Sequence, residues 1–75
     1  MNDAAGKRVL IIGSSGAVGR HVCRALKNAG YRVAGFDRAP MPDGFDIDDM
    51  RIGSITDGAM LNELAQGAHA LVHLA

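Results

Sequence analysis

Hydrophobic residues occur in short separate runs, and each run has the length and spacing of one secondary-structure element. Arg8–Ile12 is apolar and rich in β-branched residues without alternation, which predicts a strand buried on both faces of a parallel sheet. From Ala17 to Ala29 apolar residues recur at helical spacing, and Gly30 suits the left-handed position after a helix. The inward side chains of this helix are expected to be Val18, Val22, Ala25, Leu26 and Ala29. A second strand from Tyr31 to about Phe36 follows so closely that it must run parallel to the first, which predicts a βαβ unit.

The second half of the chain continues this alternation. Arg38–Asp49 contains both prolines and four aspartates, which predicts a solvated loop, and a brief strand is expected at about Met50–Ile52. Thr56 or Asp57 can cap a second helix whose acidic first turn suits the helix dipole. That helix is expected to end at Gly67, to be followed by an apolar run over 70–75, and to bury Met60, Leu61 and Leu64. The chain is therefore predicted to be α/β, a Rossmann-type parallel sheet with helices on both faces that ends after about the fourth strand.

A glycine-rich loop joins the first strand to the first helix with the spacing Gly13-x-x-Gly16-x-x-Gly19. The first glycine lets the chain turn, the second lets backbone N–H groups approach a phosphate, and the third lets the helix pack closely. A helix N-terminus carries unpaired N–H groups and about half a positive charge, so it binds a pyrophosphate without a lysine. Ser14 and Ser15 can add hydroxyl donors. The Gly-Lys-Ser/Thr sequence of a P-loop is missing, which argues against ATP hydrolysis, and glycines that merely shape a turn are the less favoured alternative.

An acidic residue follows the second strand at the distance that dinucleotide-binding folds use. Asp37 lies 18 residues after Gly19, where a carboxylate can accept hydrogen bonds from the adenosine ribose hydroxyls. The same carboxylate would repel the 2′-phosphate of NADP. Arg38 is adjacent and could offer a cation to a phosphate or stack on adenine. NAD is therefore preferred over NADP as the expected cofactor; a turn-starting aspartate and a solvated arginine are the alternatives.

Composition narrows the class of protein. With 75 residues the chain can hold at most one small domain, and the lone Cys23 cannot form an internal disulfide. Eight basic and eight acidic residues balance, which argues against nucleic acid or an anionic membrane surface as a partner. The apolar runs are too short for a membrane span or a signal peptide. We expect a soluble protein in the reducing environment of the cytoplasm.

Taken together, these motifs resemble the extended short-chain dehydrogenase/reductase family, and its NAD-dependent epimerase/dehydratase branch in particular. The resemblance rests on the glycine loop, on Asp37, on Gly53-Ser54-Ile55-Thr56-Asp57 before the second helix and on His73-Leu74-Ala75. It covers Lys7–Ala75. By position it implies phosphate contacts at Gly13, Ser15, Gly16, Ala17, Val18 and Gly19. It also implies adenosine ribose contacts at Asp37 and Arg38, adenine contacts at Ser54 and Ile55, and a cofactor groove lined by Leu74 and Ala75.

Departures from the family pattern bear on the cofactor and on catalysis. Ile12 stands where the family usually has threonine, and Ser54 where it usually has aspartate, which implies weaker anchoring of adenine. The family's Ser/Thr and Tyr-x-x-x-Lys catalytic residues have no counterpart, since Tyr31 is the only tyrosine and Gly35 stands four residues later. Residues 1–75 are therefore expected to be the N-terminal portion of a dinucleotide-binding domain that is itself inactive. The substrate-binding part, with a sugar nucleotide or related carbonyl or alcohol substrate, would belong to a longer parent.

Two other functions stay open, a non-catalytic dinucleotide-sensing module and a flavin or mononucleotide binder. His69 and His73 lie four residues apart, but a third ligand is lacking, so no metal is expected. Cys23 adjoins the apolar stripe of the first helix and is interpreted as structural. Self-association is expected at the last strand, whose outer edge has no predicted partner.

Overall fold

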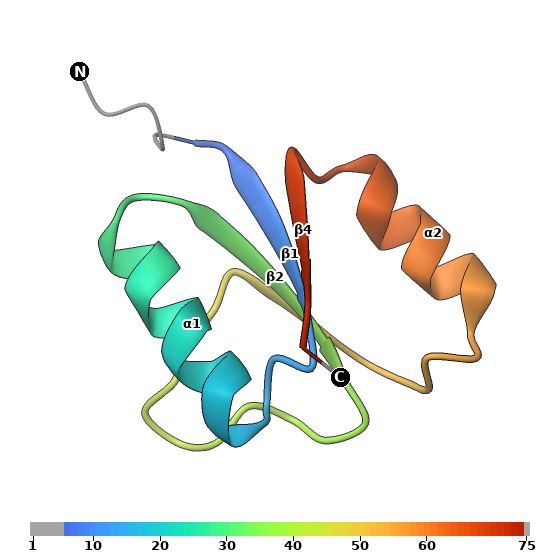
Figure 1. Ribbon diagram of the computed structural model, residues 1–75, viewed down its shortest axis with the longest axis horizontal. Helices are drawn as coiled ribbons and strands as arrows, with labels where there is room; N and C mark the ends of the chain where they lie inside the picture. The colour runs from blue at the N-terminus through green and yellow to red at the C-terminus, as the bar shows by residue number, and fades with distance from the viewer. Residues whose placement is uncertain (1–5, 75) are drawn as a thin grey trace.

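Four strands form one parallel sheet in the order β3-β2-β1-β4 (Figure 1). They are β1 (Arg8–Ile12), β2 (Arg32–Asp37), β3 (Asp49–Ile52) and β4 (Ala70–His73). These assignments come from a computed structural model that describes residues 6–74. The brief strand expected near Met50 is confirmed as β3, and the strand expected over 70–75 ends at His73, with Ala75 outside the described residues.

The two helices cover opposite faces of the sheet, as predicted (Figure 1). Helix α1 (Ala17–Asn28) joins β1 to β2, and α2 (Gly58–Gln66) joins β3 to β4. The connection through α1 places β2 on one side of β1, and the connection through α2 crosses back from β3 and places β4 on the other side of β1. Because crossovers between parallel strands are right-handed, reversing the direction of travel puts the second helix on the other face. The predicted Rossmann-type α/β architecture is therefore confirmed.

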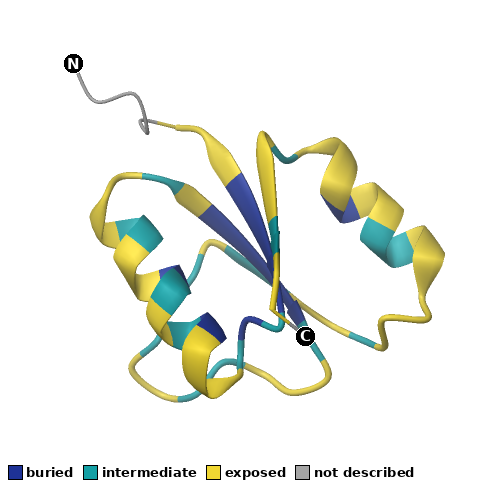
Figure 2. Cartoon of the chain, in the orientation of Figure 1, coloured by how far each residue is buried: buried dark blue, intermediate teal, exposed yellow. Residues whose placement is uncertain are grey.

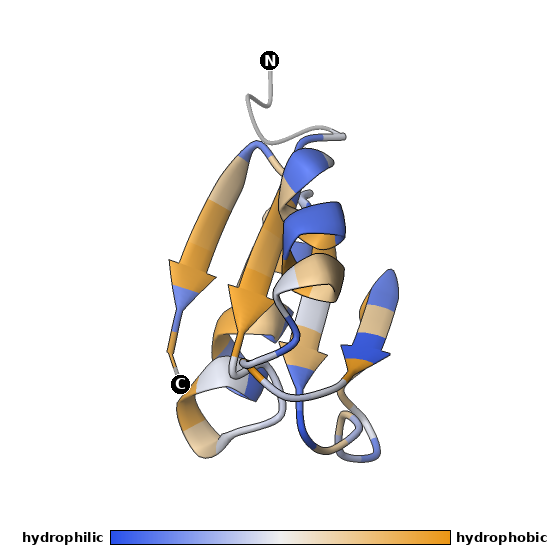
Figure 3. Ribbon diagram, turned by 90° about the vertical axis from the view of Figure 1, so that its right-hand side faces the viewer, coloured by the Kyte–Doolittle hydropathy of each residue, from blue (hydrophilic) through white to orange (hydrophobic). Residues whose placement is uncertain are grey.

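Alternate residues of the central strands supply two separate cores. Leu10 and Ile12 pack with Phe36 and Leu64 on the face that α2 covers. Val9 and Ile11 pack with Cys23 and Val33 on the face that α1 covers. Figure 2 shows the burial concentrated in β1 and β2, and Figure 3 shows that β1 is also strongly hydrophobic. The unbroken apolar run of β1 thus has the explanation expected from sequence, a strand with a helix on each side.

Helix α1 buries a narrower face than its apolar pattern predicts. Gly19 and Cys23 are buried and Val22 and Leu26 are partly buried, but Val18 is 65% exposed. Ala25 and Ala29 are also exposed, so the expected inward positions of Val18, Ala25 and Ala29 are wrong. The helix lies against the turn after β1 at Gly19, so the face that contains Gly19, Cys23 and Leu26 points inward. Val18 lies outside this buried face.

The end of α1 determines where β2 begins. Gly30 has φ +99°, its N–H donates to Lys27 O at 3.0 Å, and the Tyr31 N–H donates to Leu26 O at 3.1 Å. This pair of hydrogen bonds is a Schellman motif, which occupies the Tyr31 amide. The strand therefore starts at Arg32, one residue later than predicted, and extends to Asp37.

Helix α2 begins at a side-chain cap. Asp57 is the N-cap residue, and its Oδ1 accepts a hydrogen bond from the Met60 N–H at 3.1 Å. The expected acidic first turn is wrong, because Asp57 precedes the helix and the first turn itself contains no acidic residue. Leu64 is buried while Met60 and Leu61 pack at its side, so the predicted inward face is confirmed. Across residues 6–74, no helix combines the length and the apolar character needed to cross a membrane.

Candidate functional site

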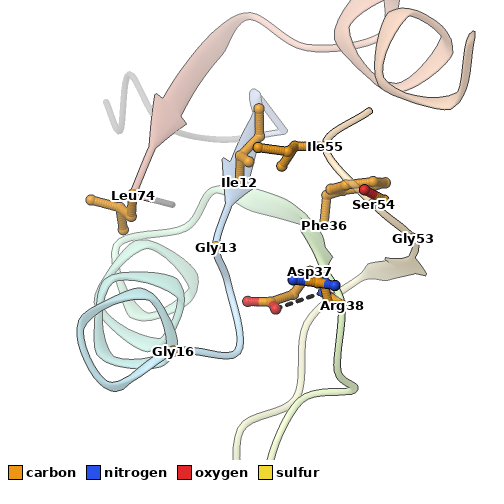
Figure 4. Close-up of a pocket in the computed structure, with 10 residues that line it drawn as sticks. All are labelled: Ile12, Gly13, Gly16, Phe36, Asp37, Arg38, Gly53, Ser54, Ile55 and Leu74. Atoms are coloured by element: carbon orange, nitrogen blue, oxygen red, sulfur yellow. Dashed lines mark hydrogen bonds between the residues drawn. The ribbon is translucent and has the colours of Figure 1, made fainter. Parts of the chain in front are cut away.

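A cavity of about 350 Å³ lies at the carboxyl ends of β1 and β2 (Figure 4). It is lined by Ile12, Gly13, Gly16, Phe36, Asp37, Arg38, Gly53, Ser54, Ile55 and Leu74. In the sheet β2 lies on one side of β1, and β4, which comes later in the chain, lies on the other side. Ligands of open α/β sheets bind at such a reversal of strand order, outside the carboxyl ends of the strands. The cavity therefore occupies the position expected of a ligand site in this fold.

The glycine loop forms one wall of the cavity. Gly13 has φ +90°, a conformation that favours glycine, and its N–H donates to Phe36 O at 2.8 Å. Gly16 is the N-cap of α1 in an extended conformation, and no side chain of the described residues caps this helix. The N–H groups of its first turn are consequently left for water or a ligand, and the helix dipole favours an anionic one.

The third glycine is required by contact with the loop itself. A Cβ at Gly19 would lie 1.9 Å from Gly13 O and 3.0 Å from Ser14 Cα. The close approach predicted at this position is confirmed, although the partner is the turn after β1 rather than the body of the sheet. Ala17 and Val18 are exposed on the first turn of α1 and do not line the cavity.

Asp37 ends β2 with its carboxylate held by backbone amides. The Ser15 N–H donates to Oδ2 at 2.9 Å, and the N–H groups of Arg38 and Ala39 donate to Oδ1 at 2.6 and 3.4 Å. A carboxylate can accept about four hydrogen bonds, so one further donor can be accommodated without breaking these three. Arg38 is exposed and lines the same part of the cavity (Figure 4).

The two serines of the loop have different surroundings. Ser14 is fully buried with Oγ 3.5 Å from Met50 Sδ, so the expectation that its hydroxyl faces a phosphate is wrong. Gly35 makes this burial possible, because a Cβ there would lie 2.6 Å from Ser14 Oγ. Ser15 Oγ donates to Ala39 O at 2.7 Å. Its hydroxyl therefore connects the glycine loop to the segment after β2.

Apolar side chains form the rest of the cavity wall. Ile12 and Phe36 lie at its base, while Ile55 and Leu74 are 56% and 39% exposed at its sides (Figure 4). Sequence reasoning did not identify Phe36 as a site residue, although its place directly before Asp37 at the end of a strand was a usable signal. Ala75, predicted to line the groove with Leu74, lies outside the described residues.

The loop between β2 and β3 packs on the outer side of α1. Arg24 lies over the Phe45 ring, with Cζ 3.9 Å from the centroid, and its Nη2 donates to Gly44 O at 2.9 Å. His21 meets the same ring edge-on, with the ring centroids 5.3 Å apart. This part of the predicted solvated loop is thus attached to the helix that carries the glycine loop.

Two of the four aspartates expected to be solvated have partners: Asp49 begins β3 and pairs with Arg51, and Asp48 is held by two hydrogen bonds. Lys27 Nζ donates to Asp48 Oδ1 at 2.9 Å, and the Val33 N–H donates to Oδ2 at 2.7 Å. These two hydrogen bonds, the Lys27 one foremost, lower the pKa of Asp48 below its ordinary value of 3.8. Asp48 therefore ties the end of the loop to α1 and β2.

Buried Cys23 and His69 have structural surroundings. Burial raises the pKa of the Cys23 thiol from 9.0 to about 11, which makes it a poor nucleophile at neutral pH. His69 precedes β4, and its Nδ1 accepts a hydrogen bond from the Arg8 N–H at 3.0 Å. Among residues 6–74 there is no group of three or more His, Cys, Asp or Glu side chains arranged to hold a metal ion.

Comparison with known proteins agrees with this geometry. The profile of the NAD dependent epimerase/dehydratase family matches residues 9–75, from β1 to the end of the chain. The chain belongs to this family. The predicted resemblance is therefore confirmed. No curated protein gave a match.

Three solved structures are similar to the chain. A short-chain dehydrogenase/reductase superfamily protein from Agrobacterium tumefaciens with bound NAD is 38% identical, with a TM-score of 0.78 over 91% of this chain and 20% of that one. MoeE5 in complex with UDP-glucuronic acid and NAD is 28% identical, with a TM-score of 0.79 over 91% of this chain and 22% of that one. The Bordetella bronchiseptica enzyme WbmF in complex with NAD+ is 29% identical, with a TM-score of 0.78 over 96% of this chain and 24% of that one. The chain spans less than a quarter of the length of each of these proteins.

Proposed function

We propose that this family member binds NAD and that its 75 residues hold the adenosine half of the cofactor. The observation that carries the proposal is the shared cavity, in which the glycine loop and the Asp37 carboxylate stand side by side at the carboxyl ends of β1 and β2. The pyrophosphate would lie at the uncapped start of α1, against Gly13, Gly16 and the first helical turn. Binding of NAD by three similar proteins of known structure supports this proposal.

The ribose and the base would occupy the remaining walls. Asp37 would accept a hydrogen bond from one adenosine ribose hydroxyl, and its negative charge would disfavour a 2′-phosphate, which favours NAD over NADP. Ser15 would act on the ribose indirectly, because its amide and hydroxyl hold Asp37 and Ala39. Adenine would lie against Ile55 and Ser54, with Arg38 at its outer side and Leu74 along the groove.

For the full enzyme we propose an epimerase or dehydratase reaction on a sugar nucleotide or related alcohol or carbonyl substrate. The complex of MoeE5 with UDP-glucuronic acid and NAD supports this substrate class. When bound, NAD supplies a hydride acceptor. Within residues 6–74 the only tyrosine is Tyr31, which packs beside the α1-side core, so the acid and base groups of the reaction are proposed to come from chain beyond this segment.

Self-association of the 75-residue chain is proposed to occur through β4. This strand pairs with β1 on one side, and Leu71 is 50% exposed on it. An exposed apolar edge strand is a template for pairing, and a second copy of the chain would satisfy it. Analytical ultracentrifugation is expected to detect dimers that Leu71→Lys weakens; a monomer at all concentrations would exclude this contact.

Isothermal titration calorimetry with NAD, NADP, AMP and FAD tests the cofactor assignment. NAD is expected to bind more tightly than NADP, and AMP is expected to retain part of the affinity because the adenosine contacts lie on this chain. Preferential binding of FAD, or no binding of any adenine nucleotide at millimolar concentration, would exclude the proposal.

A further inference from the structure

We propose that the turn at Asp43–Gly44 is a site of spontaneous covalent modification, at which aspartate converts to isoaspartate. The chain contains a second Asp-Gly pair, Asp57–Gly58, which the fold protects from the same reaction. The modification needs neither a cofactor nor an enzyme, so it is independent of the proposed binding of NAD.

Both Asp-Gly pairs have the groups that the reaction requires. The glycine nitrogen bonds to the aspartate Cγ, and the amide proton leaves with the carboxyl hydroxyl as water, which closes a succinimide ring. Water then adds to one of the two ring carbonyls and opens the ring, giving aspartate or isoaspartate, so no oxidant or reductant is consumed. Glycine favours the first step, because it has no side chain to shield its nitrogen and its backbone turns freely.

Solvent access and free space do not distinguish the two pairs. All four residues are exposed. A Cβ at Gly44 or at Gly58 would meet nothing within 4 Å, so neither glycine nitrogen is crowded by a neighbouring element. A difference in reactivity between the two pairs must therefore come from the hydrogen bonds that hold them.

The pair at Asp57–Gly58 is held on each of its reacting groups. Asp57 Oδ1 accepts the Met60 N–H at 3.1 Å, and the Gly58 N–H donates to Thr56 O at 3.0 Å. Asp57 O accepts the Leu61 N–H at 3.1 Å, which fixes the plane of the peptide that would have to rotate. Ring closure here would break the N-cap and the first turn of α2, so the helix start protects Asp57.

The pair at Asp43–Gly44 has none of these restraints. It occupies the centre of a turn that the Phe45 N–H closes by donating to Pro42 O at 3.2 Å, and Gly44 has φ +86°. Across residues 6–74 no hydrogen bond or ion pair holds the Asp43 carboxyl or the Gly44 N–H. The attacking nitrogen and the carboxyl carbon that it attacks are therefore both free to meet.

The product would change the attachment of this loop to α1. Isoaspartate carries the backbone through its Cβ and Cγ, which lengthens the turn between Pro42 and Phe45. Arg24 Nη2 donates to Gly44 O at 2.9 Å, directly after the modified bond, and the Arg24 guanidinium lies over the Phe45 ring. A longer turn would displace both of these contacts.

Peptide mapping of the aged wild-type chain tests the proposal. Trypsin cuts after Arg38 and Arg51, so the two Asp-Gly pairs fall in separate peptides, residues 39–51 and residues 52–75. After several weeks in mildly acidic buffer at physiological temperature, isoaspartate is labelled with protein-L-isoaspartate methyltransferase and S-adenosylmethionine. Peptide 39–51 is expected to carry about tenfold more label than peptide 52–75, the rate factor that corresponds to an N-cap. Equal labelling, or more label on the second peptide, would overturn the proposal.

Two controls separate the site and the cause. Asp43→Glu places the carboxyl one methylene further away, where a succinimide cannot form, and is expected to remove the label from its peptide; label that remains would overturn the assignment to Asp43. In guanidinium chloride the turn and the cap are both lost, so the two peptides of the wild-type chain are expected to be labelled within about threefold of each other. A tenfold difference that persists in denaturant would overturn the protective role of the fold.

Discussion

The Ser15 N–H donates a hydrogen bond to Asp37 Oδ2 at 2.9 Å, which joins the glycine loop directly to the acidic end of β2. The two features that the proposed function assigns to pyrophosphate and ribose are therefore in contact before any ligand binds. The Ser15 hydroxyl adds a second link through Ala39 O at 2.7 Å. Such pre-existing links reduce the ordering that binding would otherwise require.

Replacing Asp37 is expected to change cofactor preference. Asp37→Ala removes the proposed acceptor for a ribose hydroxyl and should weaken NAD binding by about tenfold to a hundredfold, the range for one hydrogen bond to a charged group. NADP binding should fall less, because the repulsion of its 2′-phosphate is also removed. Calorimetry with both cofactors measures the difference, with Asp43→Ala, an exposed aspartate of the following loop, as the control. Equal losses for the two cofactors would contradict the assigned role.

A methyl group at Gly19 is expected to prevent native packing. The added Cβ would lie 1.9 Å from Gly13 O, which is backbone and cannot rotate away. We expect Gly19→Ala to lower the free energy of unfolding by about 3 kcal/mol or more, as severe overpacking does. Urea denaturation provides the measurement. Gly58→Ala is the matched control, since nothing lies within 4 Å of its Cβ, and it should change stability by less than about 1 kcal/mol.

Gly16 offers a substitution that separates binding from folding. A Cβ there would lie 3.6 Å from Gly13 O, an ordinary contact, and its φ of −71° suits any residue. Gly16→Ala should therefore leave the melting temperature nearly unchanged. It should weaken NAD binding by about tenfold, because the methyl group lies where a phosphate is proposed to approach the backbone. Wild-type affinity in a folded Gly16→Ala variant would count against that position for the pyrophosphate.

Cys23 is expected to make the chain less stable at alkaline pH. Its pKa is about 11 in the folded chain and 9.0 ordinarily, so between these values the unfolded chain loses the thiol proton first. Stability is fully present below pH 9 and falls as pH rises toward 11, by about 1.4 kcal/mol at pH 10. Denaturation of wild type and Cys23→Ala across this range measures the effect. Parallel pH profiles for the two proteins would show that Cys23 does not cause it.

Asp48 is expected to make the stability of the chain fall at acid pH, whereas Cys23 does so at alkaline pH. Because Lys27 and the Val33 N–H lower its pKa, its contribution is present above pH 3.8 and is lost as pH falls through the lowered pKa. Asp48→Asn should lower the melting temperature at pH 7 by about 2–4 °C, a modest value because the ion pair is partly exposed. The difference from wild type should shrink below pH 3.8. Asp46→Asn, in the same loop, serves as the control, and a difference that does not shrink as pH falls below 3.8 would exclude the ionic explanation.

Local sequence patterns were sufficient to predict every strand and helix of the described chain. The apolar run Arg8–Ile12, the helical spacing after Ala17 and the glycine at position 30 each depend on neighbours in the sequence. The burial of Ser14 and the exposure of Val18 could not be predicted in this way. Both follow from contacts between distant segments, the first with Gly35 and the second from the close approach of α1 to Gly13.

In the candidate site, too, local patterns predict some features, while contacts between distant segments determine others. Gly13, Gly16 and Asp37 were predicted from spacing, and the structure brings them to one cavity. The attachment of Phe45 to Arg24 joins segments about 20 residues apart and leaves no periodic signal in the sequence. The Asp48 carboxylate is likewise distinguished from the other loop aspartates by Lys27 on a different element.

Ile12 belongs at once to the core beneath α2 and to the wall of the cavity. A larger side chain at this position would fill part of the cavity, and a smaller one would leave a void under α2. Affinity and stability are therefore not independently adjustable at Ile12. Attempts to engineer cofactor preference in this chain should leave that residue unchanged and replace exposed residues of the cavity wall instead.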